Sequence, residues 1–274
     1  MSEVRVPFLM YHAIQGPAGS AALAEVDPLY TITLADFEQQ MAYLRRTGFQ
    51  TISLAQFLAW HHNGESLPPK PIILTFDDGH PSHFELVLPR LTQYQFKGVF
   101  AVVSSWIGTP RSFSVDQLRT LQAAGMEIIS HGMSHLPLSD LPIPALKQEL
   151  TTSRTQLEGW LGKPIQVLAI PRGYVSVRVR QTAFEAGYQV VCTSRPDYNG
   201  LESDVYNLAR LPIKAHLEIS EFTALVEAHP ARRFLELSGY IIRRGAQKLL
   251  GPKRYDRLRA FLLGVPNKGS SPNG

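Results

Sequence analysis

Residues 71–79, PIILTFDDG, constrain the fold of this chain more than any other stretch. A continuous apolar run, residues 72–74, lies between a proline and an Asp-Asp-Gly sequence. Such a run is typical of a strand that is buried on both faces, as in parallel α/β sheets. Asp77 and Asp78 then stand at the carboxyl end of this strand, where α/β folds carry their chemistry. Taken alone, the same residues fit an ordinary Asp-Gly turn equally well.

The rest of the chain repeats the pattern of a short apolar run followed by an amphipathic stretch. Strands that alternate with helices of this length imply a parallel sheet with right-handed crossovers, most simply a closed or nearly closed α/β barrel. A length of 274 residues suits one such barrel, which typically needs roughly 250. Besides the strand around the apolar run 72–74, the predicted strands are 6–11, 49–53, 98–103, 126–129, 165–170, 188–193 and 206–211. The predicted helices lie between residues 33 and 48 and over 54–62, 84–94, 114–125, 144–160, 177–186 and 221–228.

Targeting signals and cysteine pairing are the next constraints. No run approaches the roughly 18 apolar residues that span a bilayer, and the N-terminal MSEVRVPFLMYH lacks the pattern of a secretory signal. Cys192 is the only cysteine, so no intrachain disulfide forms, which is compatible with the cytosol. We therefore expect a cytoplasmic protein or one peripheral on the cytoplasmic face of a membrane. Cys192 lies in the apolar run 188–193, where a buried, inert thiol is expected.

Charge divides the chain into an acidic body and a basic tail. Residues 231–274 hold ten Lys and Arg but only Glu236 and Asp256 as acids, a net charge of +8 against +4 for the whole chain. We expect a barrel domain over 1–230, a basic amphipathic helical tail over 231–264, divided by Gly251-Pro252, and a disordered C-terminus over 265–274.

Two interpretations of the basic tail stay open. Its apolar faces either close the bottom of the barrel, as terminal helices commonly do, or lie on an anionic membrane surface. Nucleic acid is not expected as a partner, because the aromatic residues of the tail are not spaced as a stacking platform.

A second chemical cluster, SHGMSH over residues 130–135, follows the predicted strand 126–129. His131 and His135 are four residues apart and can converge as metal ligands across a tight loop. Two imidazoles and one carboxylate form a common open metal site. The alternative is a solvated loop whose histidines bind local backbone groups, since nine histidines produce close pairs by chance.

The combination of TFDDG with SHGMSH some fifty residues later resembles the NodB-type polysaccharide deacetylases, carbohydrate esterase family 4. The resemblance extends over roughly residues 4–216, and the opening Tyr11-His12 is similar to the branch that includes the poly-N-acetylglucosamine deacetylases of bacteria. It implies a distorted (β/α) barrel of about seven parallel strands. It also implies a divalent metal, commonly Zn²⁺, that assists the removal of N- or O-acetyl groups from sugars.

Carried over residue by residue, the resemblance assigns Asp78, His131 and His135 as metal ligands and Asp77 as the general base. His12 matches the general acid of the YH branch, and His216 is the alternative acid. The third motif departs from the family: the arginine expected to pair with the base falls at Ala169, and the usual tyrosine falls at Arg172. The backbone N–H of Arg172 is expected to donate to the oxyanion, while the role of its side chain stays open. Four further histidines are interpreted as surface or helix-terminal residues: His61, His62, His80 and His83.

We therefore expect a metal-dependent hydrolase of non-peptide carbon–nitrogen bonds that deacetylates a glycan or a lipid-linked sugar. Two alternatives remain. One is a catalytically altered glycan-binding homologue, suggested by the changed third motif, and the other is a deformylase on a lipid-linked sugar. The identity of the sugar, its linkage and the oligomeric state do not follow from the sequence, because such contacts lie on loops.

Overall fold

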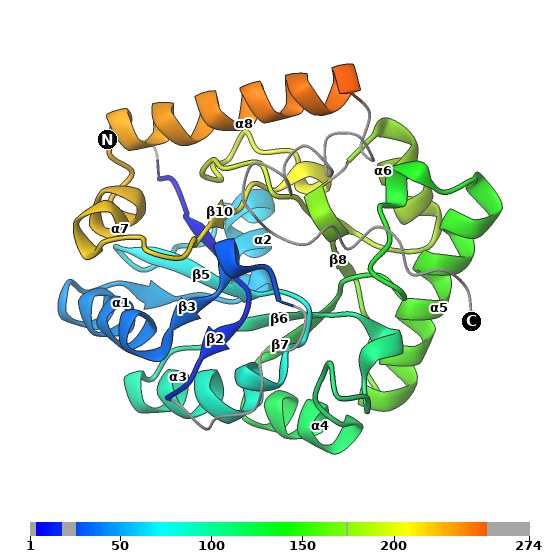
Figure 1. Cartoon of the computed structure of the whole chain (residues 1–274), viewed down its shortest axis with the longest axis horizontal. Helices are drawn as coiled ribbons and strands as arrows, with labels where there is room; N and C mark the ends of the chain where they lie inside the picture. The colour runs from blue at the N-terminus through cyan, green and yellow to red at the C-terminus, as the bar shows by residue number, and fades with distance from the viewer. Residues whose placement is uncertain (1–3, 18–25, 174, 251–274) are drawn as a thin grey trace.

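The computed structural model describes residues 4–17, 26–173 and 175–250, and it contains an α/β barrel (Figure 1). Seven parallel strands follow one another in the order β10-β1-β5-β6-β7-β8-β9, and β4 pairs with β5 outside this path. The predicted distorted barrel of about seven parallel strands is confirmed. The strands are β1 Phe8–Tyr11, β2 Ile14–Gln15, β3 Ile32–Thr33, β4 Gln50–Thr51, β5 Pro71–Phe76, β6 Val99–Val102, β7 Glu127–Ser130, β8 Val167–Ala169, β9 Val190–Cys192 and β10 Leu211–Pro212.

The strand β5 is the centre of the sheet, and all six of its residues are buried. It pairs with β1 on one side and with β6 on the other. Because side chains alternate along a strand, Ile72 and Leu74 face the surrounding helices while Ile73 joins the smaller cluster inside the barrel. The same alternation directs Asp77 toward the interior.

A segment around Leu208 and Leu211 closes the barrel between β9 and β1. The N–H of Leu208 donates to the carbonyl of Val191 (2.9 Å), and the N–H of Thr193 donates to the carbonyl of Leu208 (2.8 Å). Leu211 then pairs with Leu9 of β1. The predicted strand 206–211 is wrong in its extent, because a 3-10 turn at Val205–Asn207, capped by the Asp204 carboxylate, occupies its start.

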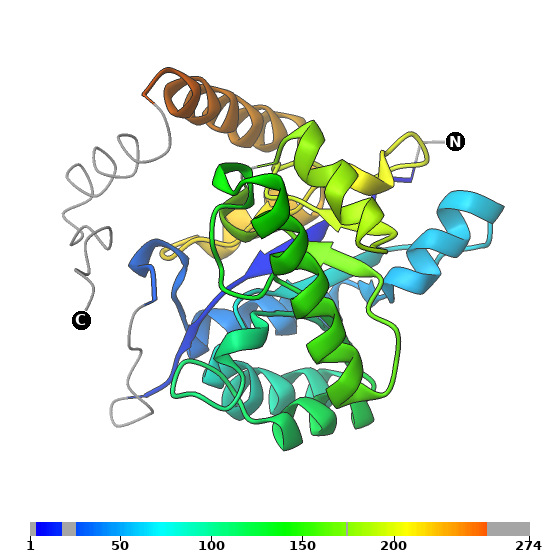
Figure 2. The same ribbon diagram turned by 90° about the vertical axis from the view of Figure 1, so that its right-hand side faces the viewer.

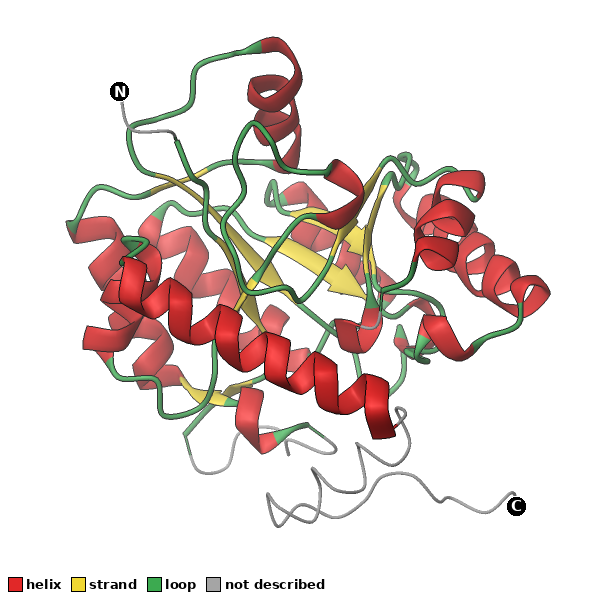
Figure 3. Ribbon diagram, turned by 90° about the horizontal axis from the view of Figure 1, so that it is seen from above, coloured by secondary structure: helices red, strands yellow, loops and turns green. Residues whose placement is uncertain are grey.

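Eight helices lie within the described residues, and those between the strands pack around the barrel (Figure 3). The capping residue of the first helix is Thr33, as predicted, since its side chain accepts from the N–H of Asp36. The predicted helix 84–94 instead begins with a π turn, His83–Val87, and α7 is capped by Glu218. The helices are α1 Leu34–Arg46, α2 Leu54–Asn63, α3 Leu88–Tyr94, α4 Val115–Ala123, α5 Ile143–Leu161, α6 Val177–Glu185, α7 Ile219–Val226 and α8 Pro230–Leu250.

The helix α8 lies across the outside of the molecule, over the loops that follow β9 and β10 (Figures 1 and 2). The expectation that apolar faces of the tail close the bottom of the barrel is wrong for this helix. Leu54, Phe57 and Trp60 of α2 pack into the interior cluster instead, and most large apolar side chains of α8 are exposed. The expected division at Gly251-Pro252, the second tail helix and the disorder of 265–274 lie outside the described residues. None of the helices within the described ranges combines the length and apolar character that crossing a membrane requires.

Candidate active site

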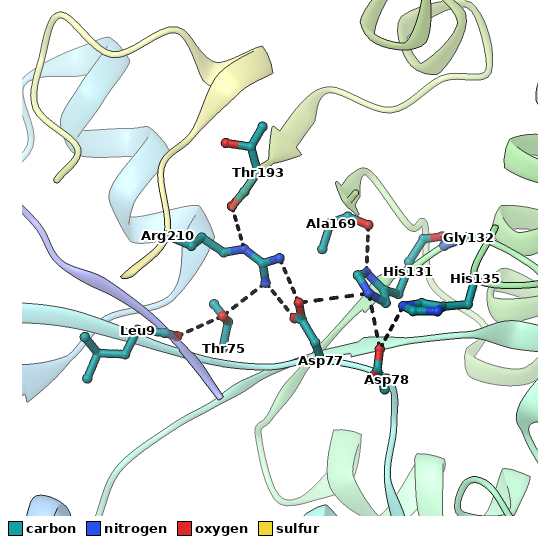
Figure 4. Close-up of polar contacts among 11 residues, drawn as sticks. Leu9, Thr75, Asp77, Asp78, His131, Gly132, His135, Ala169, Thr193 and Arg210 are labelled. Atoms are coloured by element: carbon teal, nitrogen blue, oxygen red, sulfur yellow. Dashed lines mark hydrogen bonds and ion pairs between the residues drawn. The ribbon is translucent and has the colours of Figure 1, made fainter. Parts of the chain in front are cut away.

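Asp77 and Asp78 leave β5 in different directions but reach one pocket (Figure 4). Asp77 continues the inward alternation of the strand and is 2% exposed. Asp78 has a φ of +77°, in the left-handed region that non-glycine residues rarely adopt. This turn brings its carboxylate back beside that of Asp77, so that adjacent residues serve one cavity. Backbone strain of this kind is typical of functional sites.

His131 follows β7 and contributes one imidazole to the pocket. Its Nδ1 donates to the carbonyl of Ala169 (2.8 Å), which leaves Nε2 unprotonated in the neutral ring. That Nε2 faces Asp78 Oδ1 at 3.4 Å. His135, with a φ of +59°, places its own Nε2 3.2 Å from the same oxygen.

The loop that carries the two histidines is held by Glu149 of α5. This buried carboxylate accepts from the N–H groups of Met133 (2.8 Å) and Ser134 (2.6 Å) and from the Ser134 hydroxyl (2.8 Å). The sequence analysis missed Glu149. Its signal was an acid on the apolar face of the predicted helix 144–160, between the buried Leu146 and Leu150.

The donor set of the pocket fits a divalent cation. One nitrogen each from His131 and His135 and one oxygen of Asp78 lie within 4.8 Å of one another. Within the described part of the chain, the buried Asp78 Oδ1 accepts no hydrogen bond. Burial raises the pKa of Asp78, but the adjacent imidazoles of His131 and His135, together with His12, hold it well below its usual range. The carboxylate is therefore charged, and two imidazole nitrogens and one carboxylate oxygen are donors typical of Zn²⁺.

Arg210, which the sequence analysis missed, pairs with Asp77 inside the barrel. Its Nη1 and Nη2 donate to the two carboxylate oxygens at 2.6 and 2.8 Å, and its Nε donates to the carbonyl of Thr193 at 3.0 Å. The family's arginine, expected where Ala169 stands, is thus replaced by a guanidinium from the closing segment. Its signal in the sequence was a single cation among apolar residues in the stretch LARLPI, 208–213.

The ion pair with Arg210 keeps Asp77 ionised. Burial alone would raise the pKa of Asp77. The charges of Arg210 and His131 lower this pKa by more than burial raises it, so it lies below its ordinary value. His131 responds in the opposite sense. Burial lowers its pKa, and the charges of Asp77 and Asp78 more than compensate, so the pKa is raised.

His12 lies at the end of β1, in the same buried region. Its ring stacks on Tyr30 with centroids 4.9 Å apart, and its Nδ1 is buried without a partner among the described residues. Burial lowers the pKa of His12 more than the neighbouring charges of Asp78 and Asp77 raise it. His12 thus lies at the end of the strand β1, which pairs with the strand that leads into both aspartates.

The remaining two assigned positions, Arg172 and His216, have exposed side chains. Arg172 has an exposed side chain and a φ of +57°, in the turn Pro171–Gly173 after β8. His216 is exposed, and within the described ranges no hydrogen bond or ion pair joins it to Asp77 or Asp78.

Two histidines interpreted as surface residues are buried. His83 Nε2 donates to the carbonyl of His12 (2.8 Å), and burial, followed by the charge of His80, lowers the pKa of His83 to about 3. His80 bonds Ser82 Oγ through Nδ1 (2.8 Å). The surface interpretation was wrong for His80 and His83 because the turn after Gly79 folds both rings against the end of β5.

The fold and the site define an α/β-barrel hydrolase with paired carboxylates and imidazoles at the carboxyl edge of its strands. Residues 64–191 match the family model for polysaccharide deacetylases. Just under half of the chain is therefore similar to the polysaccharide deacetylases.

Three known proteins illustrate this relationship. The Bacillus subtilis protein YxkH is 23% identical over 82% of this chain and 77% of that protein. The Escherichia coli poly-β-1,6-N-acetyl-D-glucosamine N-deacetylase is 40% identical over 29% of this chain, and the match spans 12% of that protein. The deacetylase PplD of Streptococcus pyogenes, solved with acetate, shares the fold with a TM-score of 0.74 and 22% identity over 82% of this chain and 99% of that one.

Proposed function

We propose that this chain is a metal-dependent deacetylase that removes the N-acetyl group from N-acetylglucosamine units of a glycan. The observation that carries the proposal is the convergence of Asp78, His131 and His135 in one cluster beside an ionised Asp77. The similarity to an N-deacetylase of poly-β-1,6-N-acetyl-D-glucosamine supports the choice of sugar. Zn²⁺ is the proposed metal, because its protein ligands are of these types.

The metal would be held by Asp78, His131 and His135. A divalent cation in such a site polarises the acetyl carbonyl and lowers the pKa of a water molecule to about 7. Asp77, oriented by Arg210, accepts the proton of the water that attacks the carbonyl carbon. The backbone N–H of Arg172 donates to the oxyanion that forms.

The C–N bond then breaks, releasing acetate and an amine. His12 supplies the proton to the leaving nitrogen, since an unprotonated amide nitrogen is a poor leaving group. Its position at the end of β1, the strand that pairs with β5, supports this role over the exposed His216.

The presence of Arg210 weakens the alternative of a catalytically altered glycan-binding homologue. That alternative depended on the absence of an arginine to pair with Asp77. Arg210 makes this contact from another part of the chain, so the changed third motif no longer argues for loss of activity.

The test is to measure bound metal together with acetate release from an N-acetylglucosamine oligomer. We expect His131→Ala to lose both. Asp77→Asn should retain the metal while turnover falls by about 10²–10⁴, as when a general base is removed. His62→Ala, at the exposed end of α2, is the matched control and should change neither.

Full metal content in His131→Ala, or parental turnover in Asp77→Asn, would contradict the proposal. Release of formate from a formylated sugar, without release of acetate from the acetylated one, would favour the deformylase instead.

A further inference from the structure

The helix α8 is amphipathic, but it packs on the barrel with its charged side. Glu236 is buried and bonds Lys214 (2.9 Å) and Arg232 (2.9 Å). Arg233 pairs with Asp197 (2.7 Å) in the loop after β9. Because these ion pairs join the helix to the barrel, its apolar side faces away from the protein.

The outward side of α8 carries a stripe of large apolar side chains. The exposed residues recur at intervals of one and seven positions, which places them along one side of the helix. We define the stripe as five residues with their exposed fractions: Phe234 (70%), Leu235 (63%), Ile241 (66%), Ile242 (72%) and Leu249 (87%). Apolar residues clustered in this way on a surface usually mark an interaction site.

The charge of the helix indicates what the stripe binds. The sequence of α8 holds five cations, Arg232, Arg233, Arg243, Arg244 and Lys248, and Glu236 as its one acid. That acid is buried against Lys214 and Arg232, and Arg233 pairs with Asp197, so these three charged groups of α8 lie on the barrel side of the helix. Arg243 is exposed one residue beyond Ile242.

We propose that α8 is an interfacial helix that lies flat on an anionic lipid bilayer. An apolar stripe inserts to the depth of the lipid headgroups, and the cations beside it bind anionic lipid. A protein partner or a second copy of this chain would cover the stripe equally well. The net positive charge of this part of the chain, +8 over residues 231–274, favours the anionic lipid surface over self-association, because two such surfaces repel one another.

The contacts of α8 also fix how the barrel would sit on the bilayer. Arg244 donates to the carbonyl of Val175 (3.4 Å), three residues beyond Arg172 in the loop after β8. The C-terminal end of α8 therefore reaches the edge of the barrel that carries the proposed site. Binding through the stripe brings this edge close to the lipid surface.

The experiment is co-sedimentation of the full chain with vesicles of phosphatidylglycerol and phosphatidylcholine, compared with vesicles of phosphatidylcholine alone. We expect binding to the anionic vesicles that weakens strongly at about 0.5 M NaCl. The double variant Ile241→Asp/Ile242→Asp should bind about tenfold or more weakly, because it replaces two inserted side chains with anions. Leu201→Asp, an exposed leucine (54%) outside α8, is the matched control and should bind as the parent does.

Three results would overturn the proposal. The first is equal recovery of the full chain with and without anionic vesicles. The second is a dimer in sedimentation velocity that the double variant dissociates, since the stripe would then join two copies. The third is vesicle binding only by a chain that ends at Leu250, since residues 251–274 would then cover the stripe. Circular dichroism of each variant excludes loss of the fold as the cause.

Discussion

Asp77 and Asp78 are adjacent and chemically identical, yet the fold gives them different partners. Asp77 has both oxygens paired with Arg210. Asp78 turns toward the two imidazoles through its left-handed backbone. The Asp77 carboxylate is thereby held in place by Arg210 and is not one of the three grouped metal-ligand candidates. The Asp78 carboxylate is the third member of that group, with His131 and His135. The environment of each side chain, and not its type, would separate the proposed role of general base from that of metal ligand.

At the same scale, Arg210→Met tests whether the guanidinium sets the charge of Asp77. The variant leaves a buried carboxylate without its partner, so we expect the free energy of unfolding to fall by about 3–5 kcal/mol. Burial then raises the pKa of Asp77 without opposition from Arg210. The acid limb of the pH–rate profile for acetate release should therefore move to higher pH.

Two further variants keep the Arg210 experiment interpretable. Arg180→Met breaks an exposed pair with Asp204 and should cost less than about 1 kcal/mol. Arg210→Lys retains the charge if Arg210→Met fails to fold, and it should shift the acid limb less than the loss of charge does. An unchanged acid limb in Arg210→Met would show that Arg210 does not control the ionisation of Asp77.

Cys192 provides an independent residue-scale prediction. Burial, the largest cause, raises the pKa of its thiol to about 12. At pH 8 roughly one molecule in ten thousand then carries the reactive thiolate. We expect iodoacetamide to leave the native protein unlabelled over hours and to label it fully in guanidinium chloride, as measured by intact mass. Rapid labelling of the folded protein would contradict the buried position of this thiol.

The positions of candidate site residues could be predicted where these residues are contiguous in sequence. Asp77-Asp78 and His131/His135 each follow an apolar run directly, so the strand end and the ligand type are visible together. Arg210 and Glu149 escaped prediction, because each acts on a partner far away in the sequence and only the fold brings them together.

At the scale of elements, α8 differs from the other helices in how it is held. Its attachment depends on ion pairs, among which Arg233 and Arg195 share Asp197. Burial alone would raise the pKa of Asp197. Hydrogen bonds from Arg233 and from the N–H of Tyr198 lower this pKa by more than burial raises it, so it lies below the usual value. The attachment of α8 is therefore sensitive to acid.

Asp197→Asn should reduce the free energy of unfolding at pH 7 by about 1–3 kcal/mol, because it removes charged hydrogen bonds. The depressed pKa of Asp197 contributes stability that is fully present above its unfolded pKa, near 4. This contribution is lost as the pH falls through the lower folded value. The difference in the free energy of unfolding between parent and variant, measured with urea, should thus become smaller below about pH 4.

The matched control for this element is Asp204→Asn. The carboxylate of Asp204 pairs with Arg180 at the surface, so its loss should cost less than about 1 kcal/mol at any pH. A difference between parent and Asp197→Asn that stays constant from pH 7 to pH 3 would contradict the ion-pair attachment.

At the scale of the whole molecule, the proposed metal would join two distant parts of the barrel. Asp78 follows β5, whereas His131 and His135 follow β7. A ligand that binds the folded state stabilises it by about 2.7 kcal/mol at a hundredfold excess over Kd. For a protein of this size we expect Zn²⁺ to raise Tm by about 5–10 °C after removal of metal with a chelator.

The increase in Tm should disappear in His135→Ala and persist in Asp77→Asn, whose ligand set is intact. Scanning calorimetry of the three proteins, with and without Zn²⁺, gives the comparison. An equal increase in His135→Ala would place the stabilising metal elsewhere.

The barrel itself could be predicted because apolar runs and amphipathic stretches alternate along the chain. Its closure could not. The closing segment contains only the two-residue strand β10, and its remaining pairing with β9 depends on the single bridge at Leu208. Nor did periodicity reveal the orientation of α8, because an apolar stripe has the same spacing whether it faces a core or an external surface.

The segment around Leu208 and Leu211 also determines when, during synthesis, the partner of Asp77 becomes available. Asp77 and Arg210 are 133 residues apart, so at about 5–20 residues per second the ribosome adds the guanidinium roughly 7–27 s after the carboxylate. Until then β5 to β9 can begin to pair, but the Asp77 carboxylate lacks its countercharge and the pocket lacks one wall. The nascent chain therefore lacks the Asp77–Arg210 ion pair until residue 210 has been added.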